Sequence, residues 1–289
     1  MRLRTAFVFS GGGSLGAVEV GMLRELLRRG ERADLVVGAS VGALNAAYFA
    51  GRPTLEGVAE LEAIWRGLDR RHIFPVAVGS VLRAALGRRP NLVSPRSLAA
   101  LLERHLPFAR LEEAALPCHV VAADLQSGEP VTLSRGPATL ALLASAAIPA
   151  VFPPVRIQGR FLVDGGVAAN TPIAAALALG AERVIVIPTG YACALAAPPR
   201  SVLGMALHAL GLLITRQLLE DLRHLAGQAR MHVCPPPCPV RAEPHEFSDA
   251  GALIERAAGE TRRWIDAGGL DGPLDPRPLE PHRHEMTAG

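Results

Sequence analysis

The chain has 289 residues, of which 49% are hydrophobic and 20% charged, and its formal net charge is +3. This apolar content excludes an intrinsically disordered chain, and so small a charge gives no indication of a nucleic-acid-binding surface. All 30 basic residues are arginine, which excludes a Ser–Lys dyad, a Schiff-base lysine and a lysine-dependent phosphate loop.

The first fifty residues predict two strand–turn–helix units. Residues 5–10 (TAFVFS) are apolar and β-branched, as in a buried strand, and they lead into the glycine-rich turn 11–16 (GGGSLG). Helical periodicity follows over 17–29, then a short strand at 35–37 and a small-residue helix at 43–50. Strands that alternate with helices in this way indicate an α/β fold with a parallel sheet and crossover helices.

Further helices and short strands alternate along the rest of the chain. We predict helices at 55–67, 95–105, 138–147, 201–226 and 248–267, the last capped by Ser248. We predict strands at 118–123, 131–133, 161–163, 184–187 and 231–233. A stretch rich in Arg, Pro and Gly occupies 70–94, and Pro-rich loop and tail are expected at 235–244 and 271–289. We therefore expect one domain over 1–270.

No targeting or spanning segment is predicted. The apolar run before Gly11 is about five residues, too short for the hydrophobic region of a signal peptide. The segment 202–214 is apolar but contains His208 and glycine breaks, and it falls short of the ~18 residues of a membrane span. We expect a cytoplasmic protein. Segments 70–89 and 202–219 are compatible with peripheral contact to a membrane surface, although we interpret the latter as packed core or subunit contact.

The four cysteines do not suggest a metal site. Cys234 and Cys238 flank three prolines, and neither a second cysteine pair nor a histidine cluster completes a ligand set with Cys118 or Cys193. Reduced thiols in a cytosolic protein are the simpler interpretation. We expect neither metal nor other cofactor.

The pentapeptide Gly38-Ala39-Ser40-Val41-Gly42 is the first candidate for chemistry. It lies between a predicted strand and a predicted helix, which is the setting of a nucleophilic serine on a sharp turn. The small residues at Gly38 and Gly42 suit the crowded backbone of such a turn. Because a serine hydroxyl is a poor nucleophile, Ser40 needs a base that accepts its proton.

The glycine-rich turn has two interpretations. As Gly11-x-Gly13-x-x-Gly16 after a strand it matches a dinucleotide-binding fingerprint, but the second strand ends in Gly38 and not in the acid that would bind ribose. Alternatively, consecutive glycines leave backbone N–H groups free to face a developing negative charge, as in an oxyanion hole.

Two aspartates are candidates for the base. Asp164, followed by Gly165 and Gly166, and Asp124 both stand at the ends of predicted strands, and spacing alone does not separate them. A Ser–His–Asp triad is the competing arrangement. None of the nine histidines sits in a distinctive turn, however, and Ser40 follows only the second strand, earlier than in an α/β-hydrolase.

Together these motifs resemble the patatin-like phospholipase family. Three stretches carry the resemblance: 9–23 (FSGGGSLGAVEVGML), 37–47 (VGASVGALNAA) and 144–172 (ASAAIPAVFPPVRIQGRFLVDGGVAANTP). With the elements between them it covers about residues 5–235. Separately the motifs are weak, but their order makes the combination specific.

The resemblance implies a fold, a chemistry and a set of site residues. The fold would be a three-layer α/β sandwich with a mostly parallel central sheet flanked by helices. Ser40 would be the nucleophile and Asp164 the proton acceptor of a dyad without histidine, with Asp124 a structural residue. The loop with Gly11, Gly12, Gly13 and Gly16 would form the oxyanion hole, with Gly12 and Gly13 as principal donors. Gly38, Gly42, Gly165 and Gly166 would support the motifs.

The implied activity is hydrolysis of lipid esters, in the manner of a phospholipase A or lysophospholipase, with a lipid substrate and no nucleic-acid partner. A nucleotide-binding module and a catalytically inactive scaffold are the alternatives from other classes. One departure is Leu15, because the family often has a basic residue before the last glycine of the loop. Backbone donors are unaffected by that change, but a side-chain contact to an anionic head group is lost. Acyl-chain length, head group and oligomeric state are left open.

Overall fold

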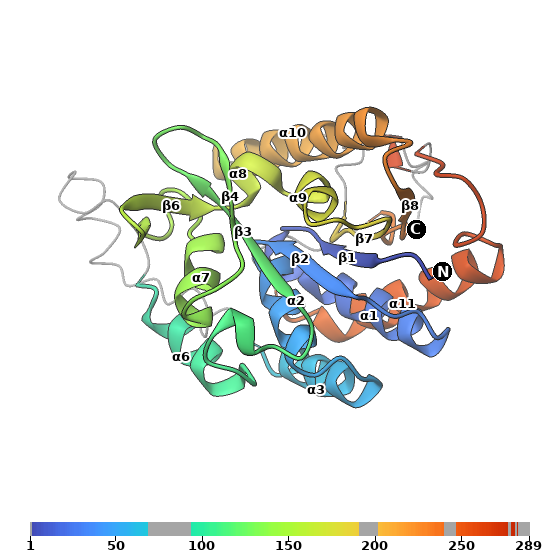
Figure 1. Cartoon of the computed structure of the whole chain (residues 1–289), viewed down its shortest axis with the longest axis horizontal. Coiled ribbons are helices and arrows are strands. Elements are labelled where there is room, and N and C mark those ends of the chain that lie inside the picture. Colours follow the sequence, from blue (N-terminus) through green and yellow to red (C-terminus); the bar gives the residue numbers. More distant parts are fainter. Residues whose placement is uncertain are drawn as a thin grey trace.

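The computed structural model describes residues 2–68, 94–190, 202–239, 247–276, 279–280 and 282. The segments 70–89 and Cys193 therefore lie outside the described residues. A twisted β-sheet runs through the middle of the molecule (Figure 1). Within the described residues it has eight strands in the order β5-β6-β3-β2-β1-β7-β8, with β4 paired to β3. Their bounds are β1 Thr5–Phe9, β2 Leu35–Ala39, β3 Cys118–Asp124, β4 Pro130–Leu133, β5 Val155–Ile157, β6 Arg160–Asp164, β7 Arg183–Ile187 and β8 Arg230–Val233.

The sheet is mostly parallel, as predicted. Strands β3, β2, β1, β7 and β8 run in one direction. Strands β4 and β6 pair antiparallel with β3, and β5 pairs antiparallel with β6. Every residue of β1 and β2 is buried, as expected for central strands whose two faces are covered by helices. The edge strand β5, with no fully buried residue, was not predicted because it lacks this apolar signal.

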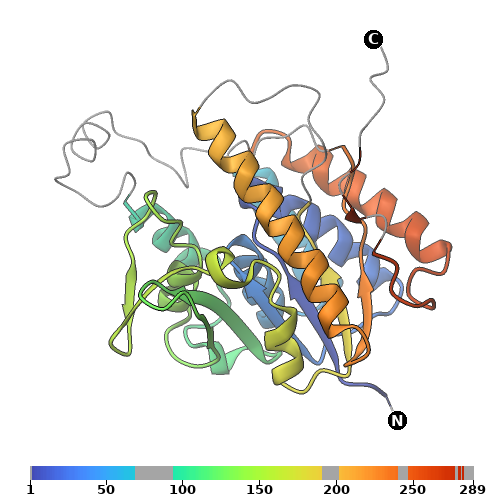
Figure 2. The ribbon, with the colours of Figure 1, turned by 90° about the horizontal axis from the view of Figure 1, so that it is seen from above.

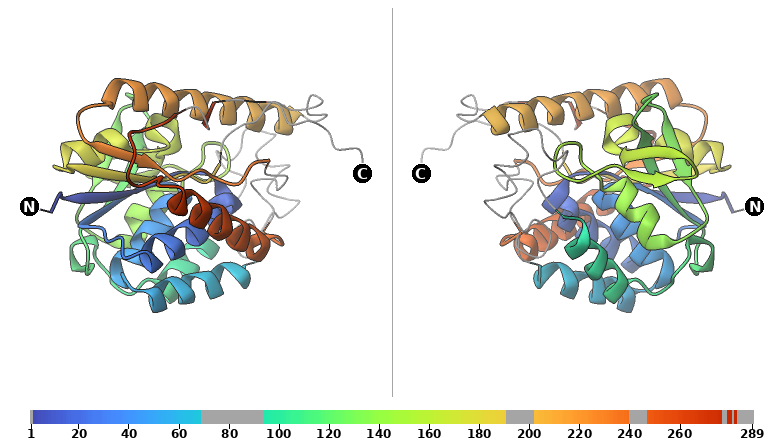
Figure 3. Two further views of the ribbon diagram at one scale, coloured as in Figure 1. Left: turned by 90° about the vertical axis from the view of Figure 1, so that its right-hand side faces the viewer. Right: turned by 90° about the vertical axis from the view of Figure 1, so that its left-hand side faces the viewer.

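Helices cover both faces of the sheet and complete a three-layer sandwich, which confirms the expected fold (Figures 1 and 3). One layer contains α1 Gly16–Arg28, α2 Val41–Gly51, α3 Leu55–Arg66, α6 Arg96–His105, α7 Ala138–Ser145 and α11 Ala250–Asp266. The other contains α8 Gly166–Ala169, α9 Ile173–Ala178 and α10 Val202–Leu225. The two cores between the layers follow strand alternation: Phe7 and Phe9 of β1 face the first, and Ala6 and Val8 face the second.

The interpretation of α10 as packed core agrees with some of its described side chains and not with others. Leu218, Leu219 and Leu222 are buried, whereas Leu212 and Leu213 are 42% and 65% exposed. Figure 2 shows the helix lying across its face of the sheet. Among the described side chains of α10, those in the core beneath it come from the second half of the helix. None of the helices in the described ranges is long and apolar enough to cross a membrane.

One further prediction needs correction near the C-terminus. Helix α11 has Asp249, not Ser248, at its N-cap position. Within the predicted tail 271–289, Leu279 is buried in the second core and Leu274 packs against that core. The contacts of these two leucines with the second core stabilise the position of this Pro-rich segment.

Candidate active site

Ser40 stands on a sharp turn between β2 and α2. Its φ is 53° and its ψ −129°, a conformation that costs a non-glycine residue about 1–3 kcal/mol and persists where the surroundings enforce it. The backbone N–H of Ser40 donates to Ser145 Oγ at 2.9 Å, and Ser145 Oγ donates to the Val121 carbonyl at 2.6 Å. Ser145 is completely buried, so this pair of bonds fixes the turn from β3 and α7.

The two glycines of the pentapeptide permit close backbone contacts. A Cβ on Gly42 would lie 2.5 Å from the Ser10 carbonyl oxygen, and one on Gly38 would lie 2.5 Å from the Gly42 carbonyl oxygen. Both neighbours are backbone atoms that cannot move aside. Glycine at these positions therefore lets α2 start directly over β1 and β2, which leaves Ser40 at the carboxyl end of its strand.

Sheet register brings Asp164 to Ser40 across one intervening strand. Ala39 of β2 pairs with Val121 of β3, and the next residue of β3, Ala122, pairs with Asp164 of β6. Gly165 then passes so close to β3 that a Cβ on it would lie 2.2 Å from the Val121 carbonyl oxygen. The absence of a side chain at Gly165 allows the chain to turn with the Asp164 carboxyl facing Ser40.

The two side chains form a hydrogen bond: Ser40 Oγ donates to Asp164 Oδ2 at 2.6 Å. The other carboxyl oxygen, Oδ1, accepts the Gly166 N–H at 2.7 Å. Asp164 is 6% exposed. Burial raises the pKa of this carboxyl to about 6, although the bonds from Ser40 and Gly166 act to lower it. At neutral pH the group is therefore mainly ionised and more basic than an ordinary aspartate.

The glycine loop lies directly beside the serine. A Cβ on Gly11 would be 3.0 Å from Ser40 Cβ. The Gly11 N–H donates to the Asn170 carbonyl at 3.0 Å, and the Gly11 carbonyl accepts Asn170 Nδ2 at 3.2 Å and Thr189 Oγ1 at 2.7 Å. Asn170 and Thr189 were not singled out from the sequence. They hold the start of the loop in place.

The backbone donors of the loop divide into two groups. Gly11 N–H is bonded as described, and Gly16 N–H donates to the carbonyls of Gly13 and Ser14. Among the hydrogen bonds of the described residues, none is donated by the N–H of Gly12 or Gly13. The latter residue, at φ 61°, also lines the pocket that contains Ser40. The amides of Gly12 and Gly13 therefore donate to no acceptor among the described residues.

Comparison with known proteins finds a matching family. The family model described as patatin-like phospholipase matches residues 7–177, more than half of the chain, and this range includes Ser40 and Asp164. The chain belongs to the patatin-like phospholipase family. This membership agrees with the resemblance of its three sequence stretches.

Individual relatives match part of this chain. An uncharacterized NTE family protein of Mycobacterium tuberculosis is 30% identical over 185 residues, which are 64% of this chain and 48% of the relative. The mouse patatin-like phospholipase domain-containing protein 7 is 25% identical over 190 residues, 64% of this chain and 13% of the relative. The chain thus matches about half the length of the mycobacterial relative, and much less of the mouse protein.

The fold also matches a solved structure. Human GIVD cytosolic phospholipase A2, solved in complex with methyl gamma-linolenyl fluorophosphonate, superposes with a TM-score of 0.51 at 14% identity. The superposition covers 95% of this chain and 58% of that one. At this identity the comparison establishes the shared fold alone.

A buried polar network supports the glycine loop of this patatin-like chain. Glu19 Oε1 accepts the Ser10 N–H at 2.8 Å, and Oε2 accepts Asn45 Nδ2 at 2.7 Å. Asn45 Nδ2 also donates to the Gly16 carbonyl at 2.9 Å. Burial raises the pKa of Glu19 well above its usual value, against the lowering effect of these bonds. The network ties both ends of the loop to α1 and α2.

Asp124, the other candidate for the base, and the described histidines make contacts other than with Ser40. Asp124 Oδ1 accepts the N–H groups of Gln126 and Ser127 at 2.9 and 3.3 Å, so this aspartate stabilises the turn between β3 and β4. Within the described residues, no histidine is hydrogen-bonded to Ser40 or Asp164. His105 does line the same pocket as Ser40, a position that its surroundings in the sequence did not indicate.

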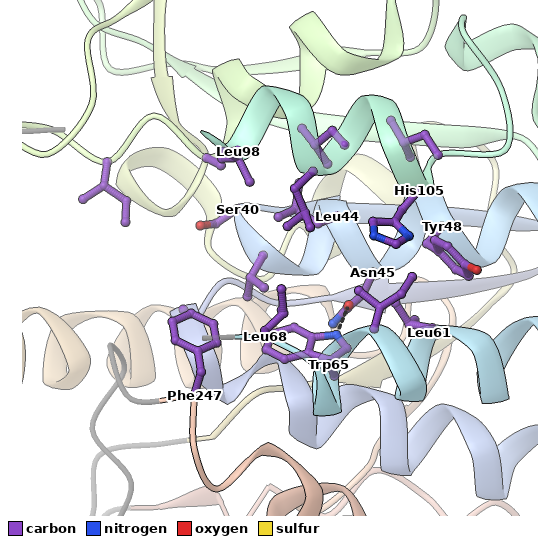
Figure 4. Close-up of a pocket in the computed structure, with 18 of the residues that line it drawn as sticks. Ser40, Leu44, Asn45, Tyr48, Leu61, Trp65, Leu68, Leu98, His105 and Phe247 are labelled. Carbon is purple, nitrogen blue, oxygen red and sulfur yellow. Dashed lines mark hydrogen bonds between the residues drawn. The ribbon is translucent and has the colours of Figure 1, made fainter. Parts of the chain in front are cut away.

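An apolar pocket extends from Ser40 between three helices (Figure 4). One face of each helix lines it: Val41, Leu44, Asn45 and Tyr48 of α2; Leu61, Ile64 and Trp65 of α3, followed by Leu68; and Leu98, Leu101, Leu102 and His105 of α6, followed by Leu106. Gly13, Ala146, Ile148, Phe152 and Phe247 complete the lining. Such a cavity suits an apolar ligand with one reacting polar group.

The described residues contain no cluster of histidine, cysteine or carboxylate side chains that could hold a metal ion. Cys118, Cys234 and Cys238 form no disulfide among the described residues, and the first two are buried. The described residues bring together the Ser40 hydroxyl, the Asp164 carboxyl, the glycine loop and an apolar pocket.

Proposed function

We propose that this protein is a lipid acyl hydrolase, a serine esterase that cleaves carboxylic esters through a Ser40–Asp164 dyad and an acyl-enzyme. The observation that carries the proposal is the 2.6 Å hydrogen bond between Ser40 Oγ and a buried Asp164 carboxyl. Family membership supports it, since the named relatives include patatin-like phospholipases.

In the acylation step, Asp164 accepts the Ser40 proton while Oγ attacks the ester carbonyl carbon. The raised pKa of Asp164, about 6, brings it closer to the working pH, where a base is most effective. The tetrahedral intermediate then collapses and expels the alcohol. The proton held by Asp164 passes to the leaving oxygen, so the carboxylate is regenerated.

The oxyanion of the intermediate is proposed to accept hydrogen bonds from Gly12 and Gly13. Their amides donate no other bond among the described residues, and Gly13 shares the pocket with Ser40. Gly11 and Gly16 support the loop through bonds of their own. Loss of one donor in a comparable site costs about 2.7–4 kcal/mol of transition-state stabilisation.

In the deacylation step, a water molecule attacks the acyl-enzyme carbonyl and gives its proton to Asp164. Collapse of the second intermediate releases the carboxylic acid and returns the proton to Ser40 Oγ. The sequence of steps is complete with the residues named, and no cofactor enters it. The ester substrate is a lipid, reached at a membrane surface or a micelle.

Hydrolysis of p-nitrophenyl butyrate by four proteins tests the proposal: wild type, Ser40→Ala, Asp164→Asn and Asp124→Asn. The last is a matched control, because it replaces the other strand-end aspartate and its amide oxygen still accepts the turn N–H groups. We expect the two dyad variants to lose at least about 100-fold in kcat and the control to retain wild-type activity. Full activity in Asp164→Asn, or none in the wild type toward this ester and phospholipid, would contradict the proposal.

A further inference from the structure

Two hydrogen bonds between α2 and α3, which line the pocket beside Ser40, fix how these helices run relative to each other. Trp65 Nε1 donates to Asn45 Oδ1 at 2.9 Å, and Tyr48 Oη donates to Glu60 Oε2 at 2.9 Å. Residue numbers thus rise along α2 as they fall along α3, so the two helices run antiparallel. Figure 4 shows Ser40 at one end of the row of lining side chains and Tyr48 at the other.

Tyr48 lines the far end of this channel, opposite Ser40 (Figure 4). Its side chain is almost completely buried, and its hydroxyl is bonded to Glu60, which also forms an ion pair with Arg52. The ring is therefore held by contacts outside the channel. His105, which follows the leucines of α6 along the lining, lies near Tyr48 in Figure 4.

The channel walls offer little to a polar ligand beyond the reacting groups. Both polar atoms of Asn45 are engaged, Oδ1 by Trp65 and Nδ2 by Glu19 and Gly16. Burial, and then the nearby Arg104, lowers the pKa of His105, which favours the uncharged form of its ring. A hydrocarbon chain is the ligand for which such walls are complementary.

Helix geometry sets the length of the channel. From Ser40 to Tyr48 the chain advances eight residues, or about 12 Å at about 1.5 Å per residue. An extended chain spans about 1.2 Å per bond, since a residue of three backbone bonds spans about 3.3–3.6 Å. About ten bonds therefore fit, and slightly fewer once the Tyr48 side chain, which tilts toward the start of α2, is included.

The cavity of this pocket measures about 110 Å³, several times the roughly 10–15 Å³ that a cavity needs to hold one water molecule. The space beside Ser40 therefore exceeds that of a single small group.

We propose that this hydrolase is selective for esters of a single medium-length acyl chain, about eight to ten carbons, and that Tyr48 sets this limit. The inference rests on the proposed function. The acyl carbon lies at Ser40, the hydrocarbon follows α2 between α3 and α6, and its terminal methyl meets the Tyr48 ring. Longer chains have no further space in line with the channel and bind with their ends displaced.

The test is kcat/KM for p-nitrophenyl esters of four, six, eight, ten and twelve carbons, each below its solubility limit. Burial of one methylene gives about a three- to fourfold gain in binding, so we expect a rise of about 100-fold from four to eight carbons. Beyond ten carbons we expect no further rise. An equal rise through twelve carbons, or no dependence on length, would overturn the proposal.

Two variants move the limit in opposite directions. Leu44→Phe adds volume midway along the channel and should lower kcat/KM for the eight-carbon ester at least about 10-fold relative to the four-carbon ester. Tyr48→Ala removes the end wall and should move the optimum to twelve carbons or more. Leu55→Phe is the matched control, because Leu55 is exposed on α3 outside the pocket, and its profile should equal that of the wild type.

The outcomes separate the two proposals. If the wild type hydrolyses none of the esters and Ser40 is not labelled by a fluorophosphonate, the proposed function fails and chain length is not at issue. If the wild type hydrolyses the esters but Leu44→Phe keeps the wild-type chain-length profile, the dyad stands and the assignment of the channel is wrong. Leu44→Phe fills open space, so this decision does not depend on whether Tyr48→Ala folds.

Discussion

Ser40 and Asp164 are 124 positions apart in the sequence, yet Ser40 Oγ donates a 2.6 Å hydrogen bond to Asp164 Oδ2. One strand, β3, separates the strands that carry them, and its register aligns the two side chains. Both side chains are buried, with Ser40 8% and Asp164 6% exposed. The proposed chemistry depends on this contact.

The pH dependence of activity should report the Asp164 carboxyl. Its pKa is raised to about 6, and only the ionised form accepts the Ser40 proton. We therefore expect kcat/KM for a short soluble ester to be constant above about pH 7 and to fall tenfold per pH unit below about pH 6. The variant His105→Gln should keep the same midpoint. A midpoint that moves in this variant would indicate that a histidine is the titrating group.

The same carboxyl should make stability depend on pH. Because its folded-state pKa, about 6, lies above the unfolded value of about 3.9, the folded state binds the proton more tightly. The resulting stabilisation is complete below about pH 4 and is lost as the pH rises through about 6. Asp164→Asn removes this loss. We compare the free energy of unfolding in urea of Asp164→Asn with that of the wild type. The difference, variant minus wild type, should therefore be roughly 2–3 kcal/mol larger at pH 7.5 than at pH 4.

An equal difference between the two proteins at both pH values would contradict that prediction. Residues placed for catalysis often reduce stability. We therefore expect the Asp164→Asn protein to be inactive and, near neutral pH, more stable than the wild type.

Gly165→Ala should disturb both fold and activity. The added Cβ would lie 2.2 Å from the Val121 carbonyl oxygen, so the chain that carries Asp164 must move away from β3. Overpacking of this kind costs about 1–3 kcal/mol. We expect that loss in the free energy of unfolding and a fall in kcat. Gly67→Ala is the control, since its nearest neighbours would be 3.5 and 3.6 Å away, and it should change stability by less than about 0.5 kcal/mol.

Glu19→Gln should destabilise the protein although the side chain keeps its shape. Both carboxyl oxygens of Glu19 accept hydrogen bonds from N–H donors, whereas an amide has one acceptor and would point its NH₂ at a donor. One buried group is then unsatisfied, at a cost of about 1–3 kcal/mol. Thermal unfolding measures this loss. Glu129→Gln, at an exposed position, should leave the melting temperature unchanged.

Much of the fold could be predicted from local pattern. The buried strands β1, β2, β3 and β7 and the amphipathic helices have strong periodicity, and their alternation indicates a parallel sheet. Strand β5 and the short helices α8 and α9 were missed. The strand is three residues long and its side chains are only partly buried, while the two helices have four and six residues. Elements this short depend on their neighbours for stability and leave little trace in the sequence.

The site could be predicted in part, for a similar reason. Residues Ser40 and Asp164 belong to compact motifs, and Gly12 and Gly13 lie in a recognisable loop. The supporting contacts of Ser145, Asn170 and Thr189 connect segments that are far apart in the chain, and no spacing rule links them. The channel is also a tertiary feature. Each of its three helices shows an ordinary apolar stripe, and only packing decides that these stripes enclose space rather than a filled core.

The most direct test of the account is the second-order rate constant for phosphonylation of Ser40 by a soluble fluorophosphonate, followed by intact mass. This reaction needs only the nucleophile and its base. We predict that the wild-type rate titrates with a midpoint near pH 6, the raised pKa of Asp164, and that Asp164→Asn reacts at least about 100-fold more slowly. An Asp164→Asn protein that is labelled at the wild-type rate would contradict the account.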